Sequence, residues 1–252
     1  MSEEVGVINL DIIEKFSKNL TDSERDSLKY RLSLSAIEEL KNINGNNFQF
    51  DDNHQSKLNA ILSSLVRIQP YRNRVPEFGI AYRGRPDFIT DDILDKLIIE
   101  SEYFRSVARP NLDQYIYQVE TPNNSTISET LAESKELHDF VCKYAGPVLK
   151  SYVTSYLYYN IKGQCSRPHI DNAFTSITVM LGLKQDIKSG YSPKLSSSFI
   201  YWPGKRPLEY RLLPGEVSIF FGACALHGRT TLEDGESTSL LLMSFRPEIY
   251  SI

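Results

Sequence analysis

The chain has 252 residues, of which 41% are hydrophobic, 24% charged and 11% aromatic, and this composition excludes an intrinsically disordered protein. Its formal net charge is -4 and its Lys and Arg residues form no block, which argues against nucleic acid and favours a small-molecule or peptide ligand. The acidic start, Met1–Glu4, and the lack of any run of about 18 apolar residues predict a cytoplasmic protein without a signal peptide or membrane span. These totals leave the oligomeric state open.

The first third of the chain is predicted to be helical, and from about residue 77 to residue 150 helices and strands are mixed. Thr21-Asp22-Ser23-Glu24 has the form of a capping box that opens a helix of about 20 residues. Apolar spacing predicts further helices over 8–18, 56–68, 90–104 and 133–144, and strands over 78–82 and 115–119. We expect residues 1–150 to form a helical layer and a substrate wall within a single domain, residues 1–252.

Short strands dominate residues 151–252. Turns that contain Gly separate them, such as Pro203-Gly204, Pro214-Gly215 and Asp234-Gly235. The predicted strands cover residues 154–161, 176–183, 197–202, 209–213, 217–221, 226–231 and 238–245, and the polar stretch 184–196 is predicted to be a loop. Many short strands at this spacing are typical of a sandwich or a closed barrel, so the whole chain is predicted to be an α+β protein with a β-barrel core.

Two of the four histidines, His169 and His227, lie in this strand-rich part. Residues i and i+2 of an extended segment point to the same side, so His169 and Asp171 can reach one metal ion together, and His227 can add a second imidazole. Two imidazoles and one carboxylate suit iron(II) that must also bind a cosubstrate and O2, whereas zinc accepts the same ligands plus water. The spacing alone leaves iron, zinc and two unrelated histidines open.

The segments around these residues occur in a specific order. Leu157–Gly163 and Arg167–Asn172 are followed by Ile177–Leu181, Pro214–Phe221 and Leu226–Gly228. In this order they resemble the iron(II)- and 2-oxoglutarate-dependent dioxygenases, particularly the prolyl-hydroxylase-like branch. The resemblance covers about residues 154–246 and implies a double-stranded β-helix barrel of the jelly-roll or cupin type. It also implies the metal-binding and catalytic residues, which are His169, Asp171 and His227.

The same resemblance implies iron(II), 2-oxoglutarate and O2 as cofactor and cosubstrates, with ascorbate as a reductant. Tyr159 matches a tyrosine whose hydroxyl contacts the distal carboxylate of 2-oxoglutarate in that branch. The family carries a basic residue in a Gly-x-Arg-x-Ser setting on the last barrel strand, but the corresponding run here is Gly235–Ser239. Ser237 therefore replaces the arginine. Ser239 keeps the serine and is expected to contribute to cosubstrate binding. Gly182 replaces a second usual partner, a tyrosine of the third strand.

Two other basic residues are predicted to bind the distal carboxylate. Arg229 is the first, because it lies two residues past His227 and should face the same interior side, with the small Ser237 opposite it. Lys184 is the second, because it lies two residues past Gly182 and has a long stem. The replaced contacts also leave open that the cosubstrate binds unusually or is not 2-oxoglutarate.

The resemblance implies an oxidoreductase that hydroxylates a C–H bond. Halogenating relatives have a small residue where this chain has Asp171, so the carboxylate favours hydroxylation, and desaturation or ring formation stays open. An amino acid, a peptide or a secondary metabolite is the preferred substrate. The alternatives are a protein side-chain hydroxylase and a catalytically inactive barrel that acts as a binding module, and the complete ligand set favours an enzyme over the latter.

Overall fold

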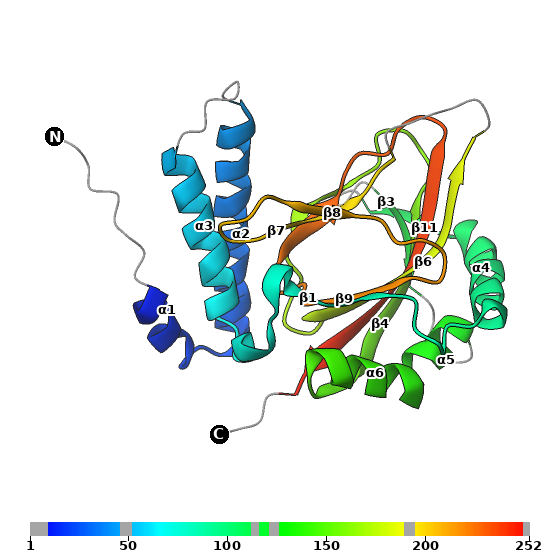
Figure 1. Cartoon of the computed structure of the whole chain (residues 1–252), viewed down its shortest axis with the longest axis horizontal. Coiled ribbons are helices and arrows are strands. Elements are labelled where there is room, and N and C mark those ends of the chain that lie inside the picture. Colours follow the sequence, from blue (N-terminus) through cyan, green and yellow to red (C-terminus); the bar gives the residue numbers. More distant parts are fainter. Residues whose placement is uncertain (1–9, 46–51, 112–115, 121–125, 189–194, 249–252) are drawn as a thin grey trace.

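The computed structural model describes residues 10–45, 52–111, 116–120, 126–188 and 195–248. Figure 1 shows two groups of helices on different sides of a ring of strands. The helices are α1 (Leu10–Ser17), α2 (Asp22–Gly45), α3 (Asp52–Arg67), α4 (Asp91–Arg105), α5 (Ile127–Ala132) and α6 (Lys135–Ala145), with short 3-10 turns at Arg72–Arg74 and Glu77–Gly79. The strands are β1 (Ile80–Gly84), β2 (Arg109–Asn111), β3 (Ile116–Glu120), β4 (Val148–Tyr159), β5 (Ser166–His169), β6 (Ile177–Ile187), β7 (Ser198–Tyr201), β8 (Leu208–Tyr210), β9 (Val217–Phe220), β10 (Leu226–Arg229) and β11 (Glu236–Pro247).

The larger sheet has the antiparallel strand order β1-β9-β6-β11-β4-β3-β2. Successive side chains point to opposite faces of a strand, and both faces of this sheet are apolar. The outer face packs on α4, α5 and α6, and its buried side chains include Tyr156, Tyr158, Leu241 and Met243. The inner face contributes a second cluster, with Leu157, Tyr159 and Leu240. Helices therefore cover this sheet from outside, while its inner face lines the barrel.

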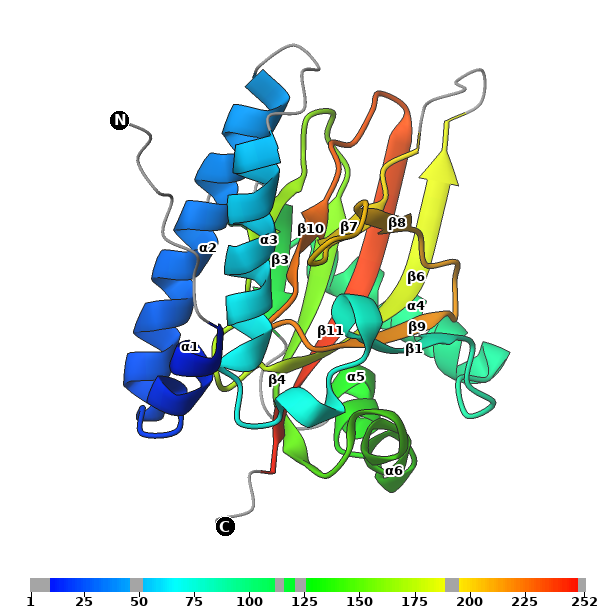
Figure 2. The same ribbon diagram turned by 60° about the vertical axis from the view of Figure 1, so that its left-hand side comes forward.

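The smaller sheet has the strand order β5-β10-β7-β8. Its outer face packs on α2 and α3, which lie side by side next to β7 and β10 in both ribbon views (Figures 1 and 2). Leu226, Ile170 and Tyr201 form this contact with an apolar stripe of the two helices that includes Leu58 and Leu62. The α2–α3 hairpin therefore covers the strands that carry His169 and His227.

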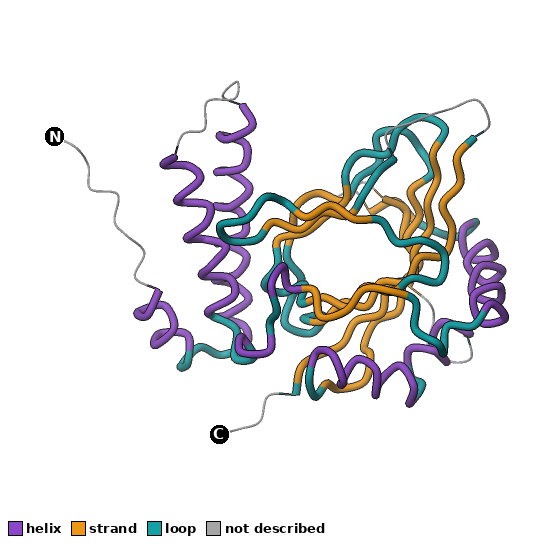
Figure 3. Tube along the Cα trace, in the orientation of Figure 1, coloured by secondary structure: helices purple, strands orange, loops and turns teal. Residues whose placement is uncertain are grey.

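The two sheets face each other, and their strands together form a ring (Figure 3). This arrangement confirms the predicted α+β architecture, but the expected helical layer is divided between both sheets, with α1–α3 on one side and α4–α6 on the other. Within the described part of the chain, no helix is both long and apolar enough to cross a membrane.

Most predicted elements are present. The capping box at the start of α2 is confirmed, since the Thr21 amide donates to Glu24 Oε2 at 2.8 Å and the Glu24 amide donates to Thr21 Oγ1 at 3.3 Å. The sequence predicted neither β2 nor α5, and it indicated β5 only as an extended segment at His169. The predicted loop 184–196 is partly wrong, because β6 continues to Ile187 by pairing with β11 as far as Glu236; residues 189–194 of that loop lie outside the described residues.

Candidate metal centre

His169, Asp171 and His227 converge at one point of the barrel. His169 on β5 and His227 on β10 are direct partners in the strand register, and Asp171 follows β5 by two residues. Asp171 Oδ1 lies 3.8 Å from the Nε2 atom of each histidine. One ligand atom from each of the three residues lies within 4.8 Å of the other two, so the group could hold a metal ion.

Backbone carbonyls orient both imidazoles. His169 Nδ1 donates to the Arg167 carbonyl and His227 Nδ1 donates to the Ala225 carbonyl, each at 2.8 Å. A carbonyl oxygen only accepts, so the ring proton is on Nδ1 and the Nε2 lone pair is left for a metal ion. Burial, aided by the neighbouring His169, lowers the pKa of His227 to about 4. That imidazole is therefore neutral at pH 7, as metal binding requires.

Asp171 is held by two residues for which the sequence predicts no role. Thr178 Oγ1 donates to Asp171 Oδ2 at 2.6 Å, and the Asp171 amide donates to the Gly222 carbonyl at 2.9 Å. A Cβ atom on Gly222 would lie 1.9 Å from Asp171 Oδ2, so only glycine allows this approach. Thr178 lies on a predicted strand and Gly222 directly follows another, but nothing in the sequence connects either residue with Asp171.

A cavity of about 110 Å³ adjoins these three side chains. Its apolar lining comes from both sheets and includes Leu157, Met180, Phe199, Leu240 and Leu242. Its polar lining, besides the three residues above, consists of Tyr159, Ser166, Thr178, Ser198, Tyr210 and Arg229. The structure thus brings the predicted residues Tyr159 and Arg229 into the same cavity as His169, Asp171 and His227.

Arg229 is a buried cation, with 4% of its surface exposed. Its guanidinium lies over the Tyr159 ring, 5.1 Å from the ring centroid, and its Nε and Nη2 donate to Ser196 Oγ at 3.1 and 2.9 Å. Burial lowers the pKa of Arg229, but a guanidinium stays protonated in proteins. Burial raises the pKa of Tyr159 to about 12, so its hydroxyl is neutral and can donate. A guanidinium and a phenol in one cavity suit a carboxylate.

No protein-family model and no curated protein matches the sequence, but solved structures do. A prolyl-4-hydroxylase from Pseudomonas putida is 14% identical over 73% of this chain and 99% of that chain, with a TM-score of 0.54. The α-ketoglutarate-dependent epimerase SnoN from nogalamycin biosynthesis is 15% identical over 75% and 86% of the two chains, with a TM-score of 0.53. The fold is that of the 2-oxoglutarate–iron(II) oxygenases.

A third similar structure is the Trichoplax adhaerens prolyl hydroxylase in complex with a hypoxia-inducible-factor peptide fragment. It is 12% identical over 79% of this chain and 94% of that chain, with a TM-score of 0.52. These comparisons confirm the predicted jelly-roll barrel and the resemblance to prolyl hydroxylases at the level of the fold.

Within this oxygenase fold, the expected position of Lys184 is wrong. Leu240 pairs with Gly182, whereas Ser239 pairs with Lys184, so β6 carries one extra residue, Leu183, at a β-bulge. A bulge changes the face to which the following side chains point. Lys184 therefore lies on the outer side, where its Nζ is 3.1 Å from Asp186 and 3.7 Å from Glu102 of α4.

Ser239 also lies outside the cavity. It is the register partner of Tyr158, whose hydroxyl donates to the Ser101 carbonyl of α4, and its neighbour Leu240 lines the cavity instead. The serine retained from the Gly-x-Arg-x-Ser pattern thus faces the helices.

The expected position of Ser237 opposite Arg229 is wrong, and Gly182 has no open space beside it. Ser237 pairs with Asp186 in the larger sheet, while Arg229 pairs with Ser198 in the smaller one. A Cβ atom on Gly182 would lie 2.4 Å from the Leu213 carbonyl oxygen. The space beside Gly182 is therefore filled by the chain that leads from β8 to β9.

Proposed function

We propose that this chain is an iron(II)- and 2-oxoglutarate-dependent oxygenase. The convergence of His169, Asp171 and His227 on one cavity of an oxygenase fold carries the proposal. Two neutral imidazoles and a carboxylate are the donor set that iron(II) oxygenases use, with positions left for further ligands. A structural zinc site would instead be closed by a fourth protein ligand.

The roles of the side chains follow from their contacts. His169 and His227 offer Nε2, and Thr178 holds Asp171 so that Oδ1 faces the same point. Arg229 and Tyr159 bind the distal carboxylate of 2-oxoglutarate through charge-assisted hydrogen bonds. Iron(II) held by His169, Asp171 and His227 would supply the redox chemistry that activates O2. The apolar lining, with Leu157, excludes water from the reacting position.

The proposed overall reaction is the hydroxylation of a C–H bond. 2-Oxoglutarate loses CO2 and becomes succinate by gaining one atom of O2, and the other oxygen atom forms the alcohol. We propose an amino acid, a peptide or a secondary metabolite as the substrate. Two similar structures are prolyl hydroxylases, one of them bound to a peptide, and a third is an epimerase from nogalamycin biosynthesis, so both peptide and small-molecule substrates occur on this fold.

Succinate release tests the proposal. The protein is loaded with iron(II) without oxygen and supplied with 2-oxoglutarate, ascorbate, O2 and a panel of amino acids, peptides, small metabolites and folded proteins. We expect iron-dependent succinate and CO2, raised by the true substrate class, and none from His169→Ala. Turnover only with a folded protein would identify a protein side-chain hydroxylase. Absence of iron(II) binding would refute the proposal, and ligand binding without turnover would identify an inactive binding barrel.

A further inference from the structure

Two short segments set the positions of Asp171 and His227. The first, residues 172–176, follows Asp171, and the second, residues 222–225, precedes His227. They are bonded to each other, since the Asp171 amide donates to the Gly222 carbonyl at 2.9 Å and the Ala223 amide donates to the Ser176 carbonyl at 3.4 Å. The two segments therefore form one block of backbone, and a shift of either one moves a proposed metal ligand.

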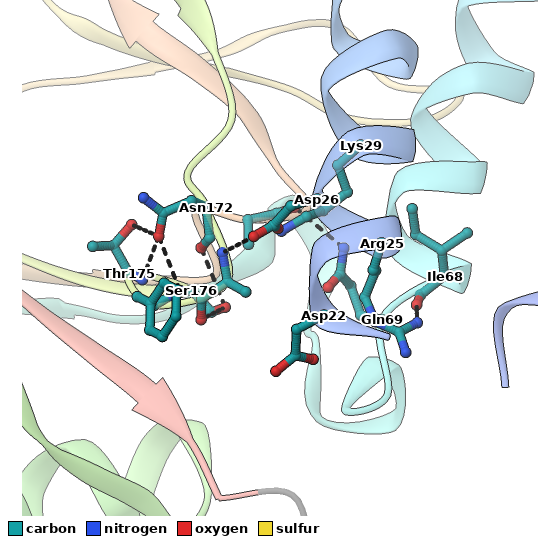
Figure 4. A network of polar contacts seen from close by, with 12 residues as sticks. Asp22, Arg25, Asp26, Lys29, Ile68, Gln69, Asn172, Thr175 and Ser176 are labelled. Carbon is teal, nitrogen blue, oxygen red and sulfur yellow. Dashed lines mark hydrogen bonds and ion pairs between the residues drawn. The ribbon is translucent and has the colours of Figure 1, made fainter. Parts of the chain in front are cut away.

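The α2–α3 hairpin holds each segment with one side chain. Asp26 of α2 accepts a hydrogen bond from the Ala173 amide through Oδ2 at 3.2 Å. Gln69, which follows α3, donates through Nε2 to the Ala223 carbonyl at 3.2 Å and to the Leu65 carbonyl at 3.0 Å. Figure 4 shows Asp26 reaching from α2 to the segment that contains Asn172 and Ser176.

These contacts belong to a buried polar network. Asp26 Oδ1 pairs with Lys29 Nζ, and Lys29 is only 1% exposed. Arg25 donates to the carbonyls of Ser17, Leu20 and Ile68, and so fixes the start of α2 next to Gln69. The Asp26 side chain is 29% exposed, and Lys29 holds it where Oδ2 accepts from the Ala173 amide.

Apolar contacts hold the same region from the same side. Ile170, between two proposed ligands, and Leu226, next to the third, pack against the hairpin. The alternate side chains, His169, Asp171 and His227, point into the barrel. The hairpin thus contacts the outer side of the strands and segments whose inner side carries the metal-binding atoms.

We propose that the α2–α3 hairpin positions the metal ligands, with Asp26 and Gln69 as positioning residues that act through residues 172–176 and 222–225. This inference rests on the proposed metal centre and assigns a role to Asp26 and Gln69, which lie 147 and 154 positions before the residues that they contact. The hairpin then controls metal affinity and ligand geometry without touching the metal.

Cobalt(II) binding tests this role without turnover. Two double variants, Asp26→Ala/Lys29→Met and Asp26→Asn/Lys29→Met, both remove the ion pair and differ only in the acceptor for the Ala173 amide. We expect cobalt(II) affinity, measured by calorimetry, to fall about tenfold in the Ala form and to recover in the Asn form, as for residues that orient metal ligands. The visible absorption of bound cobalt(II) should change in the Ala form, because it reports ligand geometry.

Two single variants complete the design. Gln69→Met removes the donor to the Ala223 carbonyl and should also weaken cobalt(II) binding about tenfold. This variant tests the positioning role if the double variants do not fold. Glu39→Gln is the matched control, because it weakens the contact of Glu39 with His54 between α2 and α3 away from both segments; its affinity should equal that of the wild type.

The outcomes separate the two proposals. Wild-type affinity and spectrum in the Asp26→Ala/Lys29→Met and Gln69→Met proteins would overturn the positioning role, as would an equal loss in Glu39→Gln. A wild-type protein that binds no cobalt(II) or iron(II) would instead refute the metal centre, and the positioning role with it.

Discussion

The three proposed metal ligands and the proposed carboxylate anchor line one cavity, but they are held in different ways. Each ligand is fixed through an atom that the metal does not need: Nδ1 of His169 and His227 donates to a backbone carbonyl, and Oδ2 of Asp171 accepts from Thr178. Arg229 is fixed by the donors of its own guanidinium, to Ser196, and by its stacking on Tyr159. The two histidines are thus oriented by neighbouring backbone and Asp171 by the Thr178 side chain, whereas Arg229 is held by the side chains of Ser196 and Tyr159, which are distant in the chain.

Removal of a metal ligand should have the largest effect. His227→Ala leaves two donors, and we expect iron(II) affinity to fall by more than about 100-fold, which exceeds the usual loss for residues that only orient a ligand. Calorimetry without oxygen measures it. His138→Ala is the matched control, since His138 on α6 contacts the Val148 carbonyl. Equal iron(II) affinities in His138→Ala and His227→Ala would contradict the assigned centre.

Removal of the anchor should affect only the other part of the cavity. Arg229→Met takes the cation from a buried carboxylate, which costs about 2–5 kcal/mol, or at least roughly 30-fold in 2-oxoglutarate affinity. Iron(II) affinity should stay unchanged. Arg229→Lys should be intermediate, because an ammonium keeps the charge but not the forked geometry. Equal 2-oxoglutarate affinities of the wild type, Arg229→Met and Arg229→Lys, measured by calorimetry, would show that the distal carboxylate binds elsewhere.

Loss of an orienting contact should have a smaller effect. Thr178→Val removes the hydroxyl that donates to Asp171 Oδ2 and keeps the shape of the side chain, so iron(II) affinity should fall about tenfold. Thr238→Val is its control, because the Thr238 hydroxyl donates to the Lys184 carbonyl, away from the ligands. A loss of the same size in both proteins would mean that the effect comes from the sheet rather than from Asp171.

The smallest effect is expected for Lys184. Lys184→Met removes a basic residue that pairs with Asp186 and Glu102 outside the cavity, and a partly exposed ion pair contributes about 1 kcal/mol or less. We therefore expect 2-oxoglutarate affinity within about twofold of the wild type and little change in the melting temperature. A loss as large as that of Arg229→Met would transfer the anchor role to β6.

The parts of the site that depend on local chain geometry could be predicted from sequence. His169 and Asp171 are two residues apart on an extended segment, and Arg229 follows His227 with the same spacing, so the pleat alone places them on the inner face. The capping box of α2 was predictable for the same reason, since Thr21 and Glu24 are close together in the chain. The barrel was predictable for a different reason, namely the many short strands and the resemblance that their order carries.

The parts of the site that depend on contacts between distant residues could not be predicted from sequence. Leu183 is apolar and fits either face of a strand buried on both sides, so no residue marks the bulge that turns Lys184 outward. Thr178 and Gly222 are ordinary strand and turn residues until the fold brings them to Asp171. Asp26 lies 147 positions from Ala173. The sequence of α2 mixes polar and apolar residues, and nothing in it marks Asp26 as a contact of Ala173.

The bulge at Leu183 also concerns how such chains diverge. Loss of this one residue would restore the regular alternation of β6 and would leave Lys184 opposite Ser239, on the outer side. The extra residue therefore lets two successive side chains, Leu183 and Lys184, both face the helices. Comparisons of related chains by residue spacing alone would place every residue beyond such a bulge on the wrong face.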